Sequence, residues 1–125
     1  EFQSQITENF KIRATASIAI DNEESPLTVS DRTYSFIIDY SVSNWGINIS
    51  AFNHNKIETG VASLPTLDGF WLTNTKLRYQ ASDKLSFDLT VNNLLDEDYR
   101  TYTTTFGFGV PNRGREIMLN AYFDL

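Results

Sequence analysis

Few side chains in this sequence are of the types that carry out chemistry. Three consecutive carboxylates, Asp96, Glu97 and Asp98, are oxygen donors of the kind that bind Ca²⁺. The single histidine, His54, could ligate haem iron through its neutral imidazole ring. The sequence has no cysteine, and it contains neither a glycine-rich phosphate loop nor a serine-centred nucleophile motif.

A second group of side chains could bind a ligand without changing it. Segment 95–114 carries a cation and several rings that could stack on a planar or apolar ligand: Arg100, Tyr102, Phe106 and Phe108. Each pattern also has a structural interpretation. The segment could pack against neighbouring loops, adjacent carboxylates on a strand point in alternate directions, and His54 could contact only water or neighbouring protein. We keep these four residues and His54 as candidate ligand contacts, and we predict no catalytic residue, no metal site, no cofactor and no enzyme.

The elements that hold these residues are predicted to be β-strands, because apolar and polar residues alternate with a period of two. The alternation is unbroken from Leu85 to Asn92, where every second residue is apolar. It predicts a short stub and six full strands: Phe2–Ile6, Phe10–Ile20, Thr33–Val42, Trp45–His54, Trp71–Tyr79, Leu85–Asn92 and Ile117–Leu125. No run of about 18 apolar residues is present, so the sequence predicts no membrane-spanning helix.

The connections between these strands are of two kinds that alternate along the chain. The short ones are Thr7–Asn9, Ser43–Asn44 and Ala81–Lys84, and the long ones are Asp21–Arg32, Glu58–Gly69 and Leu95–Gly114. Short turns on one rim and long loops on the other are typical of outer-membrane barrels, and strands of roughly 9 to 11 residues cross the hydrocarbon core. The pattern therefore predicts an all-β fold, a segment of an antiparallel transmembrane β-barrel.

The alternation also predicts which side chains face lipid. The apolar face contains Ile12, Phe36, Ile49, Phe87 and Leu119. Aromatic residues fall near both ends of this face: Phe10, Tyr40, Trp45, Tyr79 and Phe123 near the short turns, and Tyr34 and Trp71 near the long loops. The polar face would line the lumen, where His54 would lie near the outer mouth.

The hairpin that leads into Leu85 allows a prediction of register. Its most direct pairing places Tyr79 opposite Leu85. That pairing sets Lys76 opposite Asp88 on the lumen side, whereas a slip of two residues sets Arg78 there. In either case Asp88 gains a cationic neighbour. A slip of one residue is excluded, because it would turn apolar side chains into the polar lumen.

The net charge of −6 argues against a nucleic-acid-binding protein, which needs a basic stripe to neutralise phosphates. Two other classes of protein fit the strand pattern. A soluble β-sandwich or small β-barrel binding domain would bury one face and expose the other to water. A passive porin-like barrel would place the same strands around an open channel.

Two stretches near the end of the chain resemble a known family. VNNLLDEDY, from Val91 to Tyr99, and GVPNRGREIMLNAYFDL, from Gly109 to Leu125, are similar to the last two strands of TonB-dependent receptors. The first matches the family pattern Asn-Leu-Phe/Leu-Asp-x-x-Tyr, and the second matches a Pro/Gly/Arg cluster before the closing strand. The chain ends in Leu where the family usually has Phe, and its cluster is longer than Pro-Gly-Arg. The resemblance implies structural roles for Asn92, Asn93, Leu94, Asp96, Tyr99, Pro111, Arg113, Arg115, Phe123 and Leu125.

The resemblance implies a barrel of about 22 strands that is filled by a plug domain and driven by the TonB complex. Residues 1–125 would be the C-terminal part of this barrel, its last six or seven strands, without the plug domain and the earlier strands. The stub at Phe2–Ile6 would be the end of an earlier barrel strand. The family lies in the bacterial outer membrane, in contact with its lipid, and actively imports scarce nutrients such as iron-siderophores, other iron chelates or haem.

Overall fold

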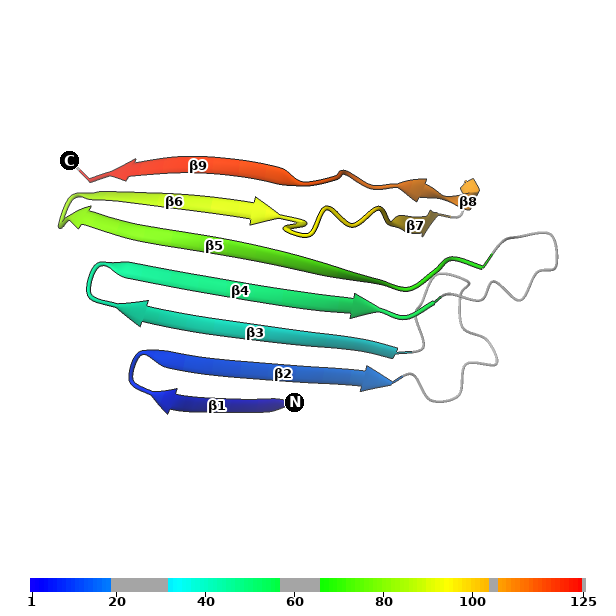
Figure 1. Cartoon of the computed structure of the whole chain (residues 1–125), viewed down its shortest axis with the longest axis horizontal. Helices are drawn as coiled ribbons and strands as arrows, with labels where there is room; N and C mark the ends of the chain where they lie inside the picture. The colour runs from blue at the N-terminus through cyan, green and yellow to red at the C-terminus, as the bar shows by residue number, and fades with distance from the viewer. Residues whose placement is uncertain (19–31, 57–65, 104–105, 125) are drawn as a thin grey trace.

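The computed structural model describes residues 1–18, 32–56, 66–103 and 106–124. Seven strands form one antiparallel sheet of order β1-β2-β3-β4-β5-β6-β9 (Figure 1). These strands are β1 Phe2–Thr7, β2 Phe10–Ile18, β3 Arg32–Val42, β4 Trp45–His54, β5 Phe70–Ser82, β6 Leu85–Asn92 and β9 Glu116–Phe123. The predicted stub and six full strands are confirmed, each within a few residues of its expected bounds.

Two short strands were not predicted. β7 (Arg100–Thr103) and β8 (Phe106–Pro111) form a separate antiparallel hairpin within segment 95–114, so the prediction of a loop there is wrong. The alternation is hard to see, because glycine occupies every second position at 107–109 and the register shifts between Thr101 and Thr103. Residues 19–31 and 57–65, which make up most of the other two predicted long loops, lie outside the described residues.

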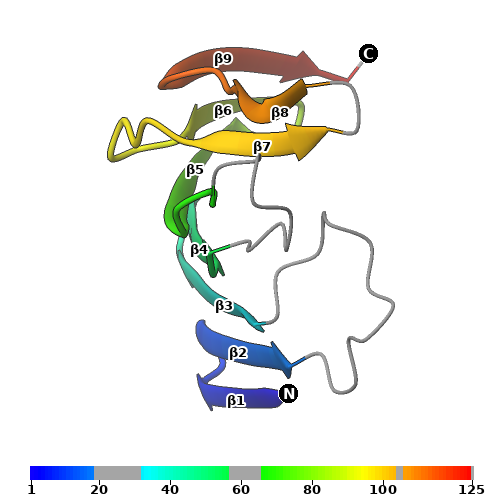
Figure 2. The same ribbon diagram turned by 90° about the vertical axis from the view of Figure 1, so that its right-hand side faces the viewer.

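The short turns lie at one end of the sheet, and the strand ends that the long connections join lie at the other (Figure 1). We call the end with the β1–β2, β3–β4 and β5–β6 turns the short-turn end, and the opposite end the loop end. Viewed along the strands, the sheet is one curved layer (Figure 2). The predicted alternation of connections is therefore confirmed. No helix within the described ranges is long and apolar enough to cross a membrane.

The strand registers bring the apolar side chains together on one face. One row across the sheet reads Ile12, Ile38, Ile49, Thr75, Val91 and Ile117, and the next reads Phe10, Tyr40, Ile47, Leu77, Leu89 and Leu119. We call this the apolar face and the other the polar face. Because side chains two residues apart share a face, Phe36 and Phe87 also belong to the apolar face. The predicted parity is confirmed.

The apolar face has no second layer in the described part of the chain. Large side chains stand exposed on it, with Phe36 at 45%, Trp71 at 43% and Leu119 at 72% of full exposure. Within the described residues, the buried hydrophobic side chains are Leu67 and Phe70 alone. A sandwich would cover such a face with a second sheet, whereas a membrane barrel presents it to lipid. The exposed face favours the barrel.

Aromatic rings gather toward both ends of the apolar face. At the short-turn end the rings of Trp45 and Tyr79 lie 4.4 Å apart between centroids. Toward the loop end Phe36 and Trp71 are stacked at 6.1 Å. Rings at both boundaries of an apolar band are expected where the band meets the two membrane interfaces.

The preferred register for the β5–β6 hairpin is wrong by two residues. Tyr79 pairs with Phe87, and Arg78 lies opposite Asp88. The turn is tight, so Ser82 already pairs with the first residue of β6. A turn of that length alone would put apolar side chains on the polar face. A bulge between positions 80 and 82 adds one residue and restores the parity, which gives the alternative register with a slip of two.

Candidate functional site

Two cations of the polar face bind Asp88, whose exposed fraction is 0%. Arg78 lies opposite Asp88, and Lys76 is its neighbour on the same face of β5. Arg78 donates from Nε to Oδ1 at 2.8 Å and from an Nη to Oδ2 at 3.1 Å. Lys76 Nζ lies 2.7 Å from Oδ2. The predicted cationic neighbour of Asp88 is confirmed, and a second cation joins it.

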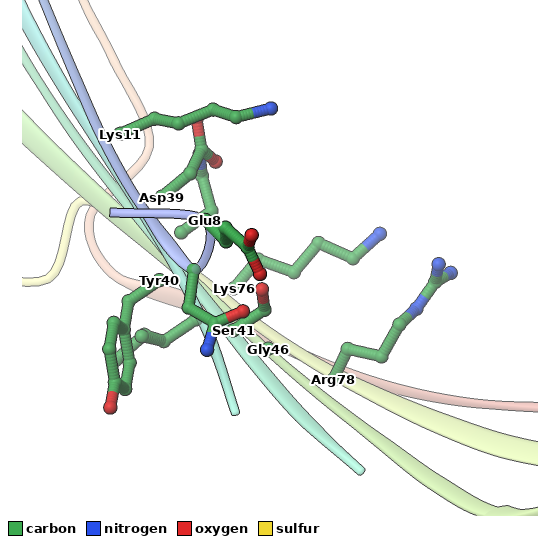
Figure 3. A pocket seen from close by; sticks show the side chains of 11 residues that line it. Glu8, Lys11, Asp39, Tyr40, Ser41, Gly46, Lys76 and Arg78 are labelled. Atoms are coloured by element: carbon green, nitrogen blue, oxygen red, sulfur yellow. The ribbon is translucent and has the colours of Figure 1, made fainter. Parts of the chain in front are cut away.

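A groove of about 350 Å³ lies beside this cluster, near the short turns. Residues of the β1–β2 turn and of β2 to β5 line it, among them Glu8, Lys11, Asp39, Lys76 and Arg78. Asn48 donates a hydrogen bond to Oδ1 of Asp39 at 2.6 Å. Figure 3 shows Lys11, Lys76 and Arg78 pointing to the same side, into the hollow of the curved sheet. The groove can therefore bind a polar or charged group that enters from that side.

Aromatic rings meet on the polar face at the loop end. The rings of His54 and Phe70, paired across β4 and β5, lie 5.0 Å apart, and Tyr99 lies 4.5 Å from Phe70. Gly69 makes this approach possible, because a Cβ there would come within 2.7 Å of the carbonyl oxygen of His54. The structure thus places His54 on the polar face, beside a ring that is only 9% exposed.

A pocket of about 560 Å³ adjoins these rings. It lies between segment 66–70 and residues 97–100, so that Arg100 and Tyr99 line it together with Asp68, Glu97 and Asp98. No three His, Cys, Asp or Glu side chains are grouped as around a metal ion, as far as the structure describes the chain. The side chains of the three aromatic ligand candidates, Tyr102, Phe106 and Phe108, lie outside the described residues, although their backbones belong to the hairpin.

Residues of the family pattern join the end of β6 to the start of β9. The side chain of Asn93, 4% exposed, donates to the backbone oxygen of Glu97 at 2.8 Å and accepts from its N–H at 2.9 Å. Oδ1 of Asp96 accepts a hydrogen bond from the backbone N–H of Arg115 at 2.9 Å. Both Asn93 and Asp96 have positive φ, 52° and 58°, which Asn and Asp adopt more readily than most residues. We call Asn93, Asp96 and Arg115 the clasp.

Three further residues of the pattern surround the clasp. Asn92 lies opposite Glu116 in the β6–β9 register. The N–H of Leu94 donates to the carbonyl oxygen of Thr73 at 2.6 Å, which fixes the chain to β5. Arg113 donates from Nη1 to Glu116 at 2.8 Å, and this hydrogen bond raises the pKa of the exposed guanidinium.

The remaining pattern residues are spread over the last elements. Pro111 pairs with Arg100 at the base of the β7–β8 hairpin. Phe123 lies opposite Leu85 at the short-turn end and is 64% exposed on the apolar face. Leu125 lies outside the described residues.

Sequence reasoning missed the residues that shape the loop end of the polar face. Leu67 and Gly69 fall in a segment predicted to be a loop, and Phe70 precedes the predicted start of its strand. Two signals were available. Three large apolar residues in a row at 70–72 mark a strand end that is apolar on both faces, and a glycine beside a strand marks a close backbone approach.

Comparison with known proteins gives a result at the level of structure only. No protein-family model and no curated protein matches the sequence. The ferripyoverdine receptor of the Pseudomonas aeruginosa outer membrane matches with a TM-score of 0.80 and 19% identity, over 98% of this chain and 18% of that chain. The ferric-catecholate import receptor Fiu of E. coli matches with a TM-score of 0.76 and 20% identity, over 94% and 19%.

A protein with a different cargo has the same fold. The copper transporter OprC matches with a TM-score of 0.71 and 19% identity, over 97% of this chain and 22% of that chain. The chain spans about a fifth of the length of the structures it matches. Its fold is that of a C-terminal barrel segment of TonB-dependent receptors, as the resemblance of its last two strands implied.

Proposed function

We propose that this chain is the C-terminal part of the barrel of a TonB-dependent receptor, which actively imports a scarce nutrient across the bacterial outer membrane. The cargo is an iron-siderophore, haem or another bulky chelate. Import changes no covalent bond, so the protein is a transporter and not an enzyme. The plug domain and the earlier strands belong to the remainder of the protein, and the TonB complex acts through that remainder.

The observation that carries the proposal is the continuous apolar face, which has no cover in the described part of the chain. Six neighbouring strands present apolar side chains to the same side, and their registers agree from β2 to β9. Lipid is the environment in which such a face is stable. The fold shared with receptors for ferripyoverdine and ferric catecholates and with a copper transporter supports nutrient import over passive diffusion.

We further propose that cargo contacts the loop end of the polar face. His54 lies there beside Phe70, and Arg100 lines the adjoining pocket. Tyr102, Phe106 and Phe108 belong to the hairpin that continues from this pocket. Rings and a guanidinium suit a planar or anionic chelate. His54→Ala and Arg100→Ala should raise the half-saturating cargo concentration of uptake, whereas Lys84→Ala, at the opposite end, should leave it unchanged.

The test is uptake of labelled iron-siderophores and haem by cells that have or lack the full-length gene. We expect uptake that saturates, that requires the gene and that stops when the TonB complex is deleted. The passive porin-like alternative gives uptake that rises linearly with concentration and does not need TonB. The soluble alternative places the full-length protein outside the membrane fraction. Either result contradicts the proposal.

A further inference from the structure

We propose that the polar face of β2 to β4, at the loop end, binds an uncharged ring that bears hydroxyl groups, as a sugar does, within the imported cargo. The inference rests on the proposed function, because it concerns a part of the molecule that is imported. It adds a chemical class to that cargo: beside its metal-binding part, the cargo carries a neutral, hydroxyl-bearing part.

The two rows of the polar face nearest the loop end differ from the rest of that face. The structure describes all of their residues on β2 to β5, and none of these residues carries a carboxylate, an ammonium or a guanidinium group. The charged residues of the polar face on these strands lie in rows nearer the short turns. Read from β2 to β5, the two rows are Thr15, Ser35, Phe52 and Leu72, and then Ser17, Thr33, His54 and Phe70.

Four hydroxyl groups stand together in these rows, on β2 and β3: those of Thr15, Ser17, Thr33 and Ser35. The spacing of neighbouring strands and of alternate residues places them at the corners of a patch of roughly 5 Å by 7 Å. One sugar ring covers a patch of that size. Thr15 and Ser35 share a hydrogen bond of 2.8 Å between their hydroxyl groups. Because a hydroxyl group has one donor and two acceptor sites, all four keep sites for a ligand.

Rings adjoin this patch on β4. Phe52 pairs with Ser35, and His54 pairs with Thr33. Phe52 is 36% exposed, so a large apolar ring stands open on the polar face. A groove of about 360 Å³ spans the junction, and its lining includes the four hydroxyl residues, Phe52 and His54. The groove therefore offers hydrogen-bonding groups on one side and rings on the other.

The chemistry of the groove selects among ligands. An anionic group would lose its hydration there without meeting a cation in these rows, which is unfavourable. A wholly apolar group would remove water from the four hydroxyl groups without replacing its hydrogen bonds. A peptide backbone offers one donor and one acceptor per residue, which is too few for so small a patch. A sugar ring suits both sides, because hydroxyl groups lie along its edge and its faces carry C–H groups that pack on aromatic rings.

The first test is saturation-transfer NMR on the purified full-length receptor, in a detergent without a sugar headgroup. The probes are the methyl glycosides of glucose, galactose and mannose. We expect at least one of them to bind, with a dissociation constant in about the millimolar range. The uronic acid of the same sugar, which differs by one carboxylate, should bind at least about tenfold more weakly. Binding of none of the glycosides, or equal binding of the acid, would overturn the inference.

Matched variants locate the bound sugar. Phe52→Ala should abolish the saturation transfer, and Thr33→Val, which keeps the shape of the side chain, should weaken binding about fivefold. Thr90→Val and Met118→Ala are the controls, because they make comparable changes on the polar face of β6 and β9, at a paired position outside the groove. Equal losses in the control variants would show that the sugar binds elsewhere, and the inference would then be wrong.

Two further measurements separate this inference from the proposed function. Phe52→Cys should react with a water-soluble thiol reagent, and the bound glycoside should slow the reaction; a cysteine that never reacts would mean that protein covers the groove. The glycoside should also compete with receptor-dependent uptake of labelled iron. A glycoside that binds without affecting uptake would point to a cell-surface glycan, which contradicts a site for cargo. If uptake requires the gene and TonB but no glycoside binds, the proposed function stands and this inference alone fails.

Discussion

Strand β6 has two neighbours, and it is joined to them in different ways. β5 precedes it through a tight turn, and the pair is held in mid-strand by the ion pairs of Asp88. β9 follows only after residues 93–115, and its start is held by the clasp, through the backbone N–H of Arg115. The first pairing is fixed by three side chains that meet on the polar face. The second is fixed by a side chain that captures a distant backbone group.

The difference shows how each kind of connection is stabilised. A tight turn brings strands together without help, but it can set the wrong parity, which the bulge at positions 80–82 corrects. A long connection does not fix the register of the strands that it joins. Contacts where the connection leaves and enters the sheet must therefore fix that register. We therefore expect substitutions at Asp88 and at Asp96 to weaken different pairings of β6.

The largest effect is expected from a substitution at a residue that takes part in both pairings. Leu89 lies opposite Leu77 on one side and Leu119 on the other, on the apolar face. Leu89→Arg should lower the free energy of unfolding of the full-length protein by about 2–4 kcal/mol, the cost of a cation near the middle of the bilayer. Urea titration in liposomes measures it. Thr90→Arg, the next residue on the polar face, should be mild, and equal losses at both positions would contradict the assignment of the two faces.

A smaller loss is expected when Asp88 alone is changed. Asp88→Asn keeps the shape but leaves Lys76 and Arg78 without a carboxylate, and we expect a loss of about 2–3 kcal/mol. This is below the cost for a wholly buried pair, because both cations are about half exposed. In a double-mutant cycle, Lys76→Gln should cost less in the Asp88→Asn background than in the wild type. Additive losses would show that the ion pair contributes nothing.

The clasp should contribute less than the ion pairs. Asp96→Ala removes the acceptor of the Arg115 N–H, which should cost about 1–2 kcal/mol. Amide hydrogen exchange should become faster at Arg115 and at Glu116, the first residue of β9, and stay unchanged at Leu77, in β5. Asp98→Ala, an exposed carboxylate two residues away, is the matched control. Faster exchange in β5 as well would mean that the two pairings are not independent.

The smallest effect is expected at Arg113, whose guanidinium is bonded to Glu116 but is 87% exposed. Exposed ion pairs contribute little, because water and salt screen them. Arg113→Ala should leave the unfolding midpoint and the β9 exchange rates unchanged. A clear drop in either would show that Arg113 belongs to the clasp.

The faces of the sheet could be predicted from sequence because side-chain parity depends only on alternation. Leu89 and Asp88 fall on opposite faces in any register that keeps apolar residues together. The register itself could not be predicted, because the bulge at positions 80–82 carries no glycine or proline that would mark it. Resemblance to the family pointed to Asp96 as a structural residue. Its partner is a backbone N–H 19 residues away, which no local pattern reveals.

The clasp also affects how far the segment between Asp96 and Arg115 can vary. The entropic cost of closing a loop grows only slowly with loop length. For the loop that leads to β9, the hydrogen bond from the Arg115 N–H to Asp96 offsets part of this cost. Residues between these positions, including the β7–β8 hairpin, then add nothing to the register of β9. A change in the length of the β7–β8 hairpin should therefore leave the register of β9 unchanged. The loop end of the sheet can thus change while the pairing of β6 with β9 stays the same.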